Sequence, residues 1–204
     1  NVSGTVDLDI DGAALDQVIA TFNAADLSGD LAVDFTGGVA VTFTGGSGAD
    51  TIAGTSNADV ISTGAGDDVI TGAAGADNIT TGAGADKVTI AAQTGGGIDV
   101  ITDFNADEDT LAFKAGAAFN NITTTDLSAS ATLQAAAGAA VAAVKVLSGT
   151  TANWDGAGDT AVFSYGGKTY ATVNAAADAN YTTADALVDI TGFTGTLSAA
   201  DFVA

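Results

Sequence analysis

The 204-residue chain contains no cysteine, no histidine and no methionine. Without cysteine it has no disulfide framework, no thiolate nucleophile and no sulfur-ligated metal. Without histidine it lacks the usual general base and the commonest ligand of transition metals, which excludes a Ser-His-Asp triad and the zinc-protease motif H-E-x-x-H. Because methionine is absent, Asn1 is not an initiator residue, and we expect a processed product or a fragment of a longer protein.

Basic residues and long apolar runs are also scarce. Four lysines face 25 acidic residues, which gives a formal net charge of −21. Such a chain repels nucleic acid, and its lysines are too scattered to bind it. The sequence contains no run of about 18 or more apolar residues that could insert into a membrane, and it does not open with a signal peptide. The chain is expected to attract cations, and its oxygen-only ligands suit Ca²⁺ and Mg²⁺.

Between Gly45 and Thr89 the chain repeats itself every nine residues, in the form GGSGADTIA, GTSNADVIS, TGAGDDVIT, GAAGADNIT and TGAGADKVT. One aspartate recurs at the same step, at Asp50, Asp59, Asp68, Asp77 and Asp86. The apolar position also keeps this step, at Ile52, Ile61, Ile70, Ile79 and Val88. The nonapeptide G-G-x-G-x-D-x-U-x is typical of a calcium-binding parallel β-helix.

The spacing predicts how the aspartates stack. Nine residues make a glycine-rich turn and a short strand, and two such units complete one coil of a flattened helix. Aspartates 18 residues apart then lie on the same edge, and strands about 4.7–4.9 Å apart leave room for calcium, which binds oxygen at about 2.3–2.6 Å. The predicted pairs are Asp50 with Asp68, Asp68 with Asp86 and, on the opposite edge, Asp59 with Asp77.

Glycines are expected to form the turns of this metal site. They adopt backbone conformations that a Cβ disfavours, and they let carbonyl oxygens converge on the ion. The predicted positions are Gly46, Gly48, Gly64, Gly66, Gly75, Gly82 and Gly84. Thr55 stands where a glycine is expected, which predicts a weaker edge at Asp59. Asp67 is either a further ligand or a solvated side chain.

These five registers resemble the RTX (repeats-in-toxin) proteins, which Gram-negative bacteria secrete through type I systems and whose repeats bind calcium in a parallel β-roll. The match covers Gly45 to about Thr102, with a bulge at residues 91–94 before a sixth, offset register at Asp99. The following segment, DVITDFNADEDTLAF, is similar to the stretch that closes the repeats in secreted metalloproteases. That resemblance implies that Asp99 and an acidic residue near Asp109 hold a last calcium.

The flanks carry weaker patterns. At the N-terminus, Leu8 and Ile10 predict a strand, and Asp11 is expected to cap a helix whose apolar face ends at Phe22. This helix is expected to cover the open end of the stack, with partner binding as the alternative. Residues 31–44 predict two strands around Gly37-Gly38, in a degenerate coil without its aspartate and hence without a complete metal site.

Beyond Phe113 the repeat is absent. Asp126 or Ser128 is expected to cap an alanine-rich helix that runs to about Val144. Strands are predicted over residues 145–147, 160–165 and 169–174, the last two joined by a hairpin at Gly166-Gly167. The apolar, acidic C-terminal end is similar to type I secretion signals; an ordinary strand followed by a short helix is the alternative.

The predicted fold class is therefore mainly β: a parallel β-roll, or calcium-binding β-helix, with an N-terminal strand-and-helix cap and a C-terminal β-rich region with one helix. The predicted boundaries are 1–44, 45–113 and 114–204.

The predicted function is that of a secreted, non-enzymatic, calcium-binding structural module that folds on export at the cell surface of a Gram-negative bacterium. Its composition is similar to that of RTX-bearing surface-layer proteins. This resemblance implies self-association into a lattice or filament and attachment to lipopolysaccharide or another surface glycan. The alternatives are the C-terminal calcium-binding and secretion domain of an enzyme or toxin, and the terminal domain of an adhesin.

Overall fold

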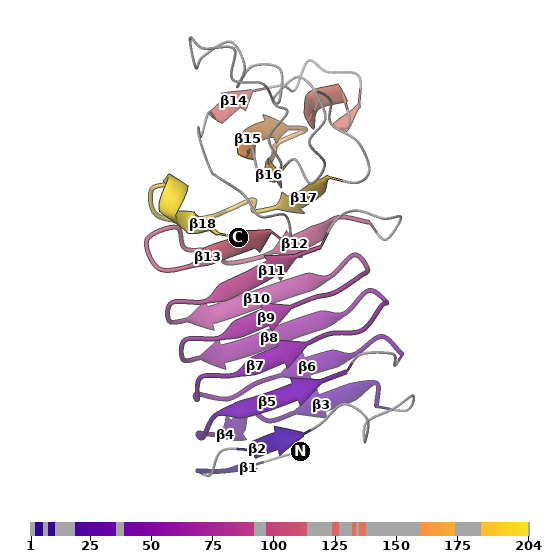
Figure 1. Ribbon diagram of the computed structural model, residues 1–204, viewed down its shortest axis with the longest axis vertical. Helices are drawn as coiled ribbons and strands as arrows, with labels where there is room; N and C mark the ends of the chain where they lie inside the picture. The colour runs from indigo at the N-terminus through magenta and orange to yellow at the C-terminus, as the bar shows by residue number, and fades with distance from the viewer. Residues whose placement is uncertain are drawn as a thin grey trace.

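The computed structural model describes residues 3–5, 8–10, 19–35, 39–91, 97–113, 124–126, 132–133, 135–137, 160–173 and 185–203. In these residues short strands stack one above another as a parallel β-solenoid, drawn from indigo to magenta in Figure 1. The predicted fold class, mainly β with a parallel β-roll, is confirmed.

The strands are three to six residues long through the repeats. Before the repeats lie β1 (Ser3–Gly4), β2 (Leu8–Ile10), β3 (Thr21–Asn23), β4 (Asp26–Leu27), β5 (Leu31–Asp34) and β6 (Thr42–Thr44). The repeats and the closing segment form β7 (Thr51–Ala53), β8 (Val60–Ala65), β9 (Val69–Thr71), β10 (Asn78–Ala83), β11 (Lys87–Ile90), β12 (Asp99–Ile101) and β13 (Thr110–Phe113). The C-terminal part contributes β14 (Thr124–Asp126), β15 (Thr160–Tyr165), β16 (Lys168–Val173), β17 (Ala186–Asp189), the 3₁₀ helix η2 (Ala199–Asp201) and β18 (Phe202–Val203).

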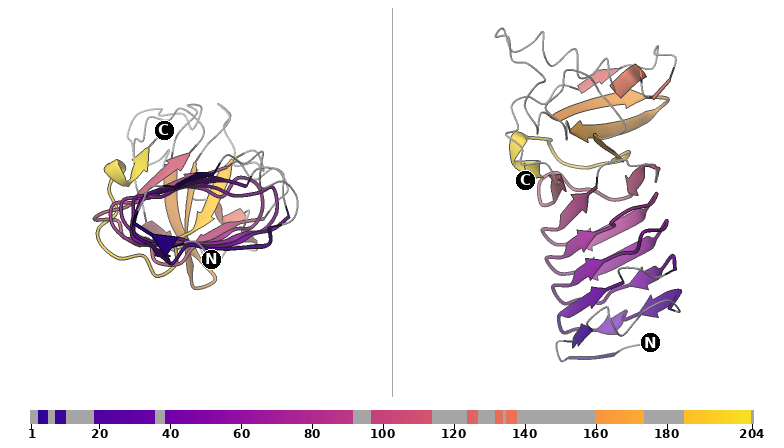
Figure 2. Two further views of the ribbon diagram at one scale, coloured as in Figure 1. Left: turned by 90° about the horizontal axis from the view of Figure 1, so that it is seen from below. Right: turned by 45° about the vertical axis from the view of Figure 1, so that its right-hand side comes forward.

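From β5 to β13, successive strands alternate between two facing sheets, so each pair of repeats makes one coil. One sheet has the order β14-β15-β16-β17-β12-β10-β8-β6-β3, the other β18-β13-β11-β9-β7-β5-β2, and β1 pairs with β4 separately. Seen along the stack, the coils superpose as a flattened oval (Figure 2). The 18-residue period predicted from the repeats is therefore the period of the coil: Ile61 pairs with Ile79, and Ile52 with Ile70.

The core is a narrow column between the sheets. The repeat isoleucines and Val88 are 0–1% exposed, as predicted, and they stack in two rows along the axis. Burial of each such side chain contributes about 1.5–3 kcal/mol, so the column gains stability with every coil. Aromatic rings continue the column at both ends. The ring centroids of Phe22 and Phe43 lie 5.8 Å apart, and those of Phe113 and Phe202 lie 6.2 Å apart.

The N-terminal strands continue the solenoid rather than forming only a cap. The expected strand at residues 8–10 and the two strands within 31–44 are confirmed. The expected helical face is wrong at Phe22, which lies in β3 and pairs with Phe43; residues 11–18 of that helix lie outside the described part of the chain. Phe22 joins the aromatic end of the column, and this non-local packing overrides the helical spacing of the local sequence.

The C-terminal part extends the nine-stranded sheet and closes the other. The predicted hairpin at Gly166-Gly167 is confirmed by β15 and β16, which pair antiparallel. β17 joins this hairpin to β12, and β18 returns to pair with β13. Both sheets of the solenoid thus continue into segments that the repeat pattern does not reach.

The alanine-rich helix is described only at residues 133 and 135–137. Its cap is Thr132, whose Oγ1 accepts the N–H of Ala135 at 3.1 Å. The expectation that Asp126 caps this helix is wrong, because Asp126 lies in β14. Ser128, the strand expected at 145–147 and the bulge at 92–94 lie outside the described residues.

Candidate metal centre

Two rows of buried aspartates run along opposite edges of the solenoid. The first row precedes the strands of the seven-stranded sheet and consists of Asp50, Asp68, Asp86 and Asp109. The second row lies at the start of the strands of the nine-stranded sheet and consists of Asp59, Asp77 and Asp99, the last of which is the first residue of β12. Each of these side chains is 5% exposed or less. The structure therefore places the five repeat aspartates on the two predicted edges, and it adds Asp109 to the first row and Asp99 to the second.

Within a row, each carboxylate after the first accepts the backbone N–H of the aspartate one coil earlier, whereas Asp50 and Asp59 accept those of Leu31 and Val41. In the first row the N–H of Asp50 donates to Asp68 Oδ1 at 2.7 Å, and that of Asp68 to Asp86 Oδ1 at 2.9 Å. In the second row the N–H of Asp59 donates to Asp77 Oδ1 at 2.9 Å. One oxygen of each carboxylate thus fixes the register of the turns.

The closing segment continues both rows at a longer step. The N–H of Asp77 donates to Asp99 Oδ1 over 22 residues, and the N–H of Asp86 to Asp109 Oδ1 over 23 residues, at 3.0 and 3.1 Å. The extra residues lie in the connections, since the strands on either side remain in register. Asp99 and Asp109 therefore occupy aspartate positions in different rows, on opposite edges of the solenoid. The implied last calcium held by both residues together does not fit this arrangement.

The second oxygen of three of these carboxylates has no hydrogen-bond partner. Oδ2 of Asp68, Asp77 and Asp86 is buried and unpaired. A buried carboxylate oxygen without a partner is costly, and a cation is the partner that its charge favours. These oxygens lie at the stacked turns, where hard oxygen ligands suit calcium.

The glycine turns bring the backbones of neighbouring coils close together beside the aspartate rows. Gly64, Gly66, Gly75, Gly82 and Gly84 have positive φ, between +101° and +144°, as the turn prediction requires. A Cβ on Gly82 would overlap the carbonyl oxygen of Gly64 one coil earlier. Gly46 and Gly48 have no positive φ; they are needed because a Cβ there would overlap the backbone of Leu27 and Gly29.

Comparison with known families identifies the repeated stretch. The family described as the RTX calcium-binding nonapeptide repeat, in four copies, matches residues 44–78 and 53–88. Residues 44–88 are RTX calcium-binding repeats. Calcium is thus the cofactor of this stretch, and the repeats indicate a calcium-binding module of type I secreted proteins. No curated protein matches the chain.

Along each row of the RTX stack the aspartate carboxylates follow one another singly, one per coil. Among the described residues, no three acidic side chains gather into a cluster that could hold a metal by carboxylates alone. A calcium ion between turns would therefore draw oxygens from the glycine-turn carbonyls as well as from aspartates. The individual ligand assignments, to the seven aspartates and the seven predicted glycines, stay predictions.

The second repeat satisfies its aspartate within its own turn. Thr55 donates to Asp59 through its backbone N–H at 2.6 Å and through Oγ1 at 3.0 Å. Both oxygens of Asp59 are therefore engaged, unlike those of Asp68, Asp77 and Asp86. This contact gives a physical reason for the predicted weakness of the Asp59 edge: the hydroxyl and the N–H occupy acceptor positions that a cation would need.

Burial raises the pKa of six carboxyls in the two rows. For Asp77, burial and the charges of Asp99 and Asp59 outweigh the hydrogen bond from the Asp59 N–H and raise the pKa to about 7. Burial likewise raises the pKa of Asp99 and of Asp109 to about 6. The pKa values of Asp50, Asp68 and Asp86 are raised for the same first reason. Without a cation, ionised rows are thus electrostatically unfavourable in the folded state.

Sequence reasoning missed two features of these turns. Asp103 accepts the backbone N–H groups of Thr81 and Gly82, each at 2.9 Å, and so closes the last coil. Thr81 and Asp103 are 22 residues apart, as are Asp77 and Asp99, and this common spacing could have indicated the role of Asp103. Gly45 and Gly54 were also missed, although they recur at nine residues; a Cβ on either would lie 2.6 Å from the Oδ2 of its own turn's aspartate.

Asp67, expected to be either a further ligand or a solvated side chain, lies at the outside of its turn. Asp67 is exposed and accepts the N–H of Ala85 at 2.9 Å. Its carboxylate therefore ties neighbouring coils at the outside of the turn.

Among the described residues no helix is long and apolar enough to cross a membrane.

Proposed function

We propose that this chain is a secreted, non-enzymatic structural module whose RTX stack folds on binding calcium outside the cell, and which contributes to a surface layer or other extracellular assembly of a Gram-negative bacterium. The observation that carries the folding part is the set of buried, unpaired carboxylate oxygens of Asp68, Asp77 and Asp86. A fold that buries them needs a cation at the turns to be stable near neutral pH.

The residues that would hold calcium are the two aspartate rows and the carbonyls of the glycine turns between them. Calcium supplies positive charge and accepts several hard oxygens in a flexible geometry. The chain itself aligns the turns. Hydrogen bonds from aspartate N–H groups to the carboxylates of the next coil set the register of each turn, and the buried isoleucine column holds the turns together. The binding free energy then adds to the free energy of folding.

Calcium is scarce in the cytosol and abundant outside the cell, so the same sequence is expected to behave differently in the two places. Before export, repulsion within the acidic rows and the ordering entropy of glycine-rich turns oppose folding. After export, calcium removes the repulsion. The chain is thus exported flexible and becomes rigid at its destination.

The assembly part rests on composition. A chain of charge −21 with no histidine or cysteine lacks the imidazole and thiol groups that many enzymes use, and divalent cations are suited to bridge acidic surfaces of neighbouring copies. Attachment to lipopolysaccharide or another surface glycan belongs to the same proposal. Electron microscopy of purified chain should show sheets or filaments in millimolar calcium that dissolve in chelator; a monodisperse monomer there contradicts the assembly part.

A second candidate is favoured by the closing segment. Asp99 and Asp109, the residues that the resemblance to secreted metalloproteases indicated, each continue one of the two rows. The chain would then be the C-terminal calcium-binding and secretion domain of an enzyme, toxin or adhesin. The intact mass of the native protein distinguishes an enzyme from a purely structural protein, because a catalytic domain must add to it.

Circular dichroism during a calcium titration tests the folding part. The β signal and the melting temperature should both rise from chelator to millimolar calcium, and constancy of both would contradict calcium-coupled folding. In calcium, Asp68→Asn should lower stability more than Asp50→Asn, because Asp68 lies between two neighbouring aspartates of the row and Asp50 stands at its start. Equal losses would refute the predicted pairing.

A further inference from the structure

The outer surface of the nine-stranded sheet differs from the rest of this acidic chain. Where β6, β8, β10 and β12 stack, the inward side chains form the core, and the outward side chains fall in two rows. The first row is Thr42, Val60, Asn78 and Val100. The second row is Thr44, Ser62, Thr80 and Thr102. We call these eight residues the neutral face, because none of them is ionisable.

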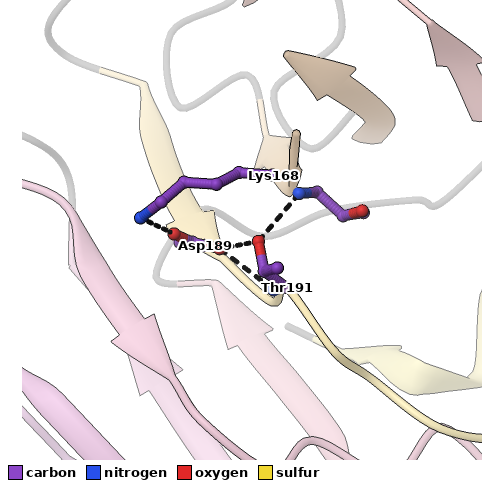
Figure 3. Close-up of polar contacts among 4 residues, drawn as sticks. Lys168, Asp189 and Thr191 are labelled. Carbon is purple, nitrogen blue, oxygen red and sulfur yellow. Dashed lines mark hydrogen bonds and ion pairs between the residues drawn. The ribbon is translucent and has the colours of Figure 1, made fainter. Parts of the chain in front are cut away.

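The neutral face has no net charge at its C-terminal end. β12 pairs with β17 there, and the residue in line with Val100 is Asp189. Its carboxylate is only 2% exposed and lies 2.6 Å from Lys168 Nζ. Thr191 also donates to it through its backbone N–H at 2.9 Å (Figure 3). The one carboxylate that continues this row is therefore neutralised within the chain.

The outer face of the seven-stranded sheet is different. Its outward positions include Asp34, in register with Ala53, and Lys87, in register with Val69. The turns that precede the strands of this sheet carry exposed carboxylates, such as Asp67 and Asp107. In a chain of charge −21, two copies that meet at these turns bring like charges together, which is unfavourable by several kcal/mol at close range. Two neutral faces can meet without this repulsion.

The neutral face is also ordered before any contact. The hydroxyls of Thr80 and Thr102 are hydrogen-bonded at 2.8 Å, and the Thr102 hydroxyl lies 3.3 Å from the Ile79 carbonyl oxygen. Side chains held in this way lose little further entropy on association. Val60 adds apolar surface at the centre, since it is 48% exposed.

The size of the neutral face favours a repeated, individually weak contact. Four strands spaced about 4.8 Å apart, each at most six residues of about 3.3 Å, span about 400 Å². A stable pair typically buries about 800 Å² on each partner. A contact of this size holds copies together only when several act at once, as in a lattice.

We propose that the neutral face is the surface through which one copy of the calcium-bound chain contacts a second copy. This inference rests on the proposed assembly and names its interface. A glycan is a poorer occupant, because none of the eight residues is aromatic and sugar rings pack preferentially on aromatic faces.

The test is sedimentation velocity of the full chain in millimolar calcium, comparing Val60→Glu with Val69→Glu. Val69 is the matched control: it holds the same repeat position, is 41% exposed, and faces outward from the opposite sheet. Val60→Glu should raise the protein concentration needed for association about tenfold or more, and Val69→Glu should leave it close to that of the unmodified chain. Asn78→Asp, which adds a charge without added bulk, should act like Val60→Glu.

Each outcome decides the matter. Circular dichroism of each variant in calcium confirms the fold, and Asn78→Asp replaces Val60→Glu if the latter does not fold. Equal association of the two glutamate variants, or a loss specific to Val69→Glu, overturns the neutral face as the interface while the proposed assembly stands. An unmodified chain that stays monomeric overturns the assembly itself. Association of the chain only after addition of a neutral glycan overturns self-contact.

Discussion

Replacing Asp77 by asparagine should change stability in opposite directions with and without calcium. In the fold, Asp77 Oδ1 accepts the N–H of Asp59, and Oδ2 is buried without a partner. Asparagine keeps an oxygen for the first contact and removes the buried charge. In chelator the variant should therefore be more stable than the unmodified chain, and in calcium it should be less stable.

The magnitude follows from the pKa of Asp77, which burial raises from 3.8 to about 7. Each tenfold change in proton affinity corresponds to about 1.4 kcal/mol, so at pH 8 the ionised side chain costs the calcium-free fold about 4 kcal/mol. An amide without good partners in the same place costs about 1–2 kcal/mol. The net gain in chelator is about 2 kcal/mol. In calcium at 100 times the dissociation constant, loss of one ion costs about 2.7 kcal/mol.

The assay is urea unfolding at pH 8, followed by circular dichroism, in chelator and in calcium. Asp26→Asn is the control, because Asp26 is an exposed aspartate of β4 and its replacement removes the same charge from the chain. Asp26→Asn should change the free energy of unfolding by less than about 0.5 kcal/mol in both media. If Asp77→Asn destabilises the protein equally in chelator and in calcium, the carboxylate is not a strained ligand and the reasoning is wrong.

The remaining predictions concern pH and the turns. In chelator these carboxyls bind protons more tightly in the folded state than in the unfolded state. Their contribution to stability should therefore be greatest below about pH 4 and should be lost as the pH rises through about 7, the pKa of Asp77. Urea melts between pH 4 and 8 test this. Gly82→Ala should destabilise by about 3 kcal/mol or more, because its Cβ would overlap the carbonyl of Gly64 at φ +101°; Gly166→Ala, at φ +61° in open space, should cost only about 1 kcal/mol in the same melts. Ala73 holds a positive φ of 72° in the fourth repeat, so Ala73→Gly should raise the free energy of unfolding by about 0.5–1 kcal/mol, and a thermal melt showing a loss would contradict this.

The aspartate rows could be predicted because their cause is local and periodic. A nine-residue step places a turn, an aspartate and an inward aliphatic residue at the same point of every half-coil. Stacking at 18 residues then follows from the closed shape of the coil, and the pairs Asp50–Asp68 and Asp59–Asp77 need no other information. The limit of this reasoning is the length of the step: once it changes to 22 or 23 residues, only tertiary hydrogen bonds show that Asp99 and Asp109 remain in the rows.

The turn glycines are required for two different reasons, and only one of them can be deduced from the repeat. The repeat identifies the positions that lack a side chain, and at Gly64 or Gly82 a positive φ explains them. At Gly46 the reason is different, because the backbone of Leu27 from a coil outside the repeat leaves no room for a Cβ. A contact of this kind depends on a neighbouring coil that carries no repeat, and it cannot be deduced from the nonapeptide alone.

The sequence by itself determined the period, the two edges and the calcium chemistry, because these depend on residue type at a fixed spacing. Tertiary structure decided how the stack begins and ends. Phe22 lies in a strand, despite its helical spacing, because Phe43 in the next coil completes its packing. Phe202 closes the seven-stranded sheet by pairing with Leu111, far away in the sequence. Such short strands carry too little local pattern to identify themselves, and they are stabilised by the partners beside which the fold places them.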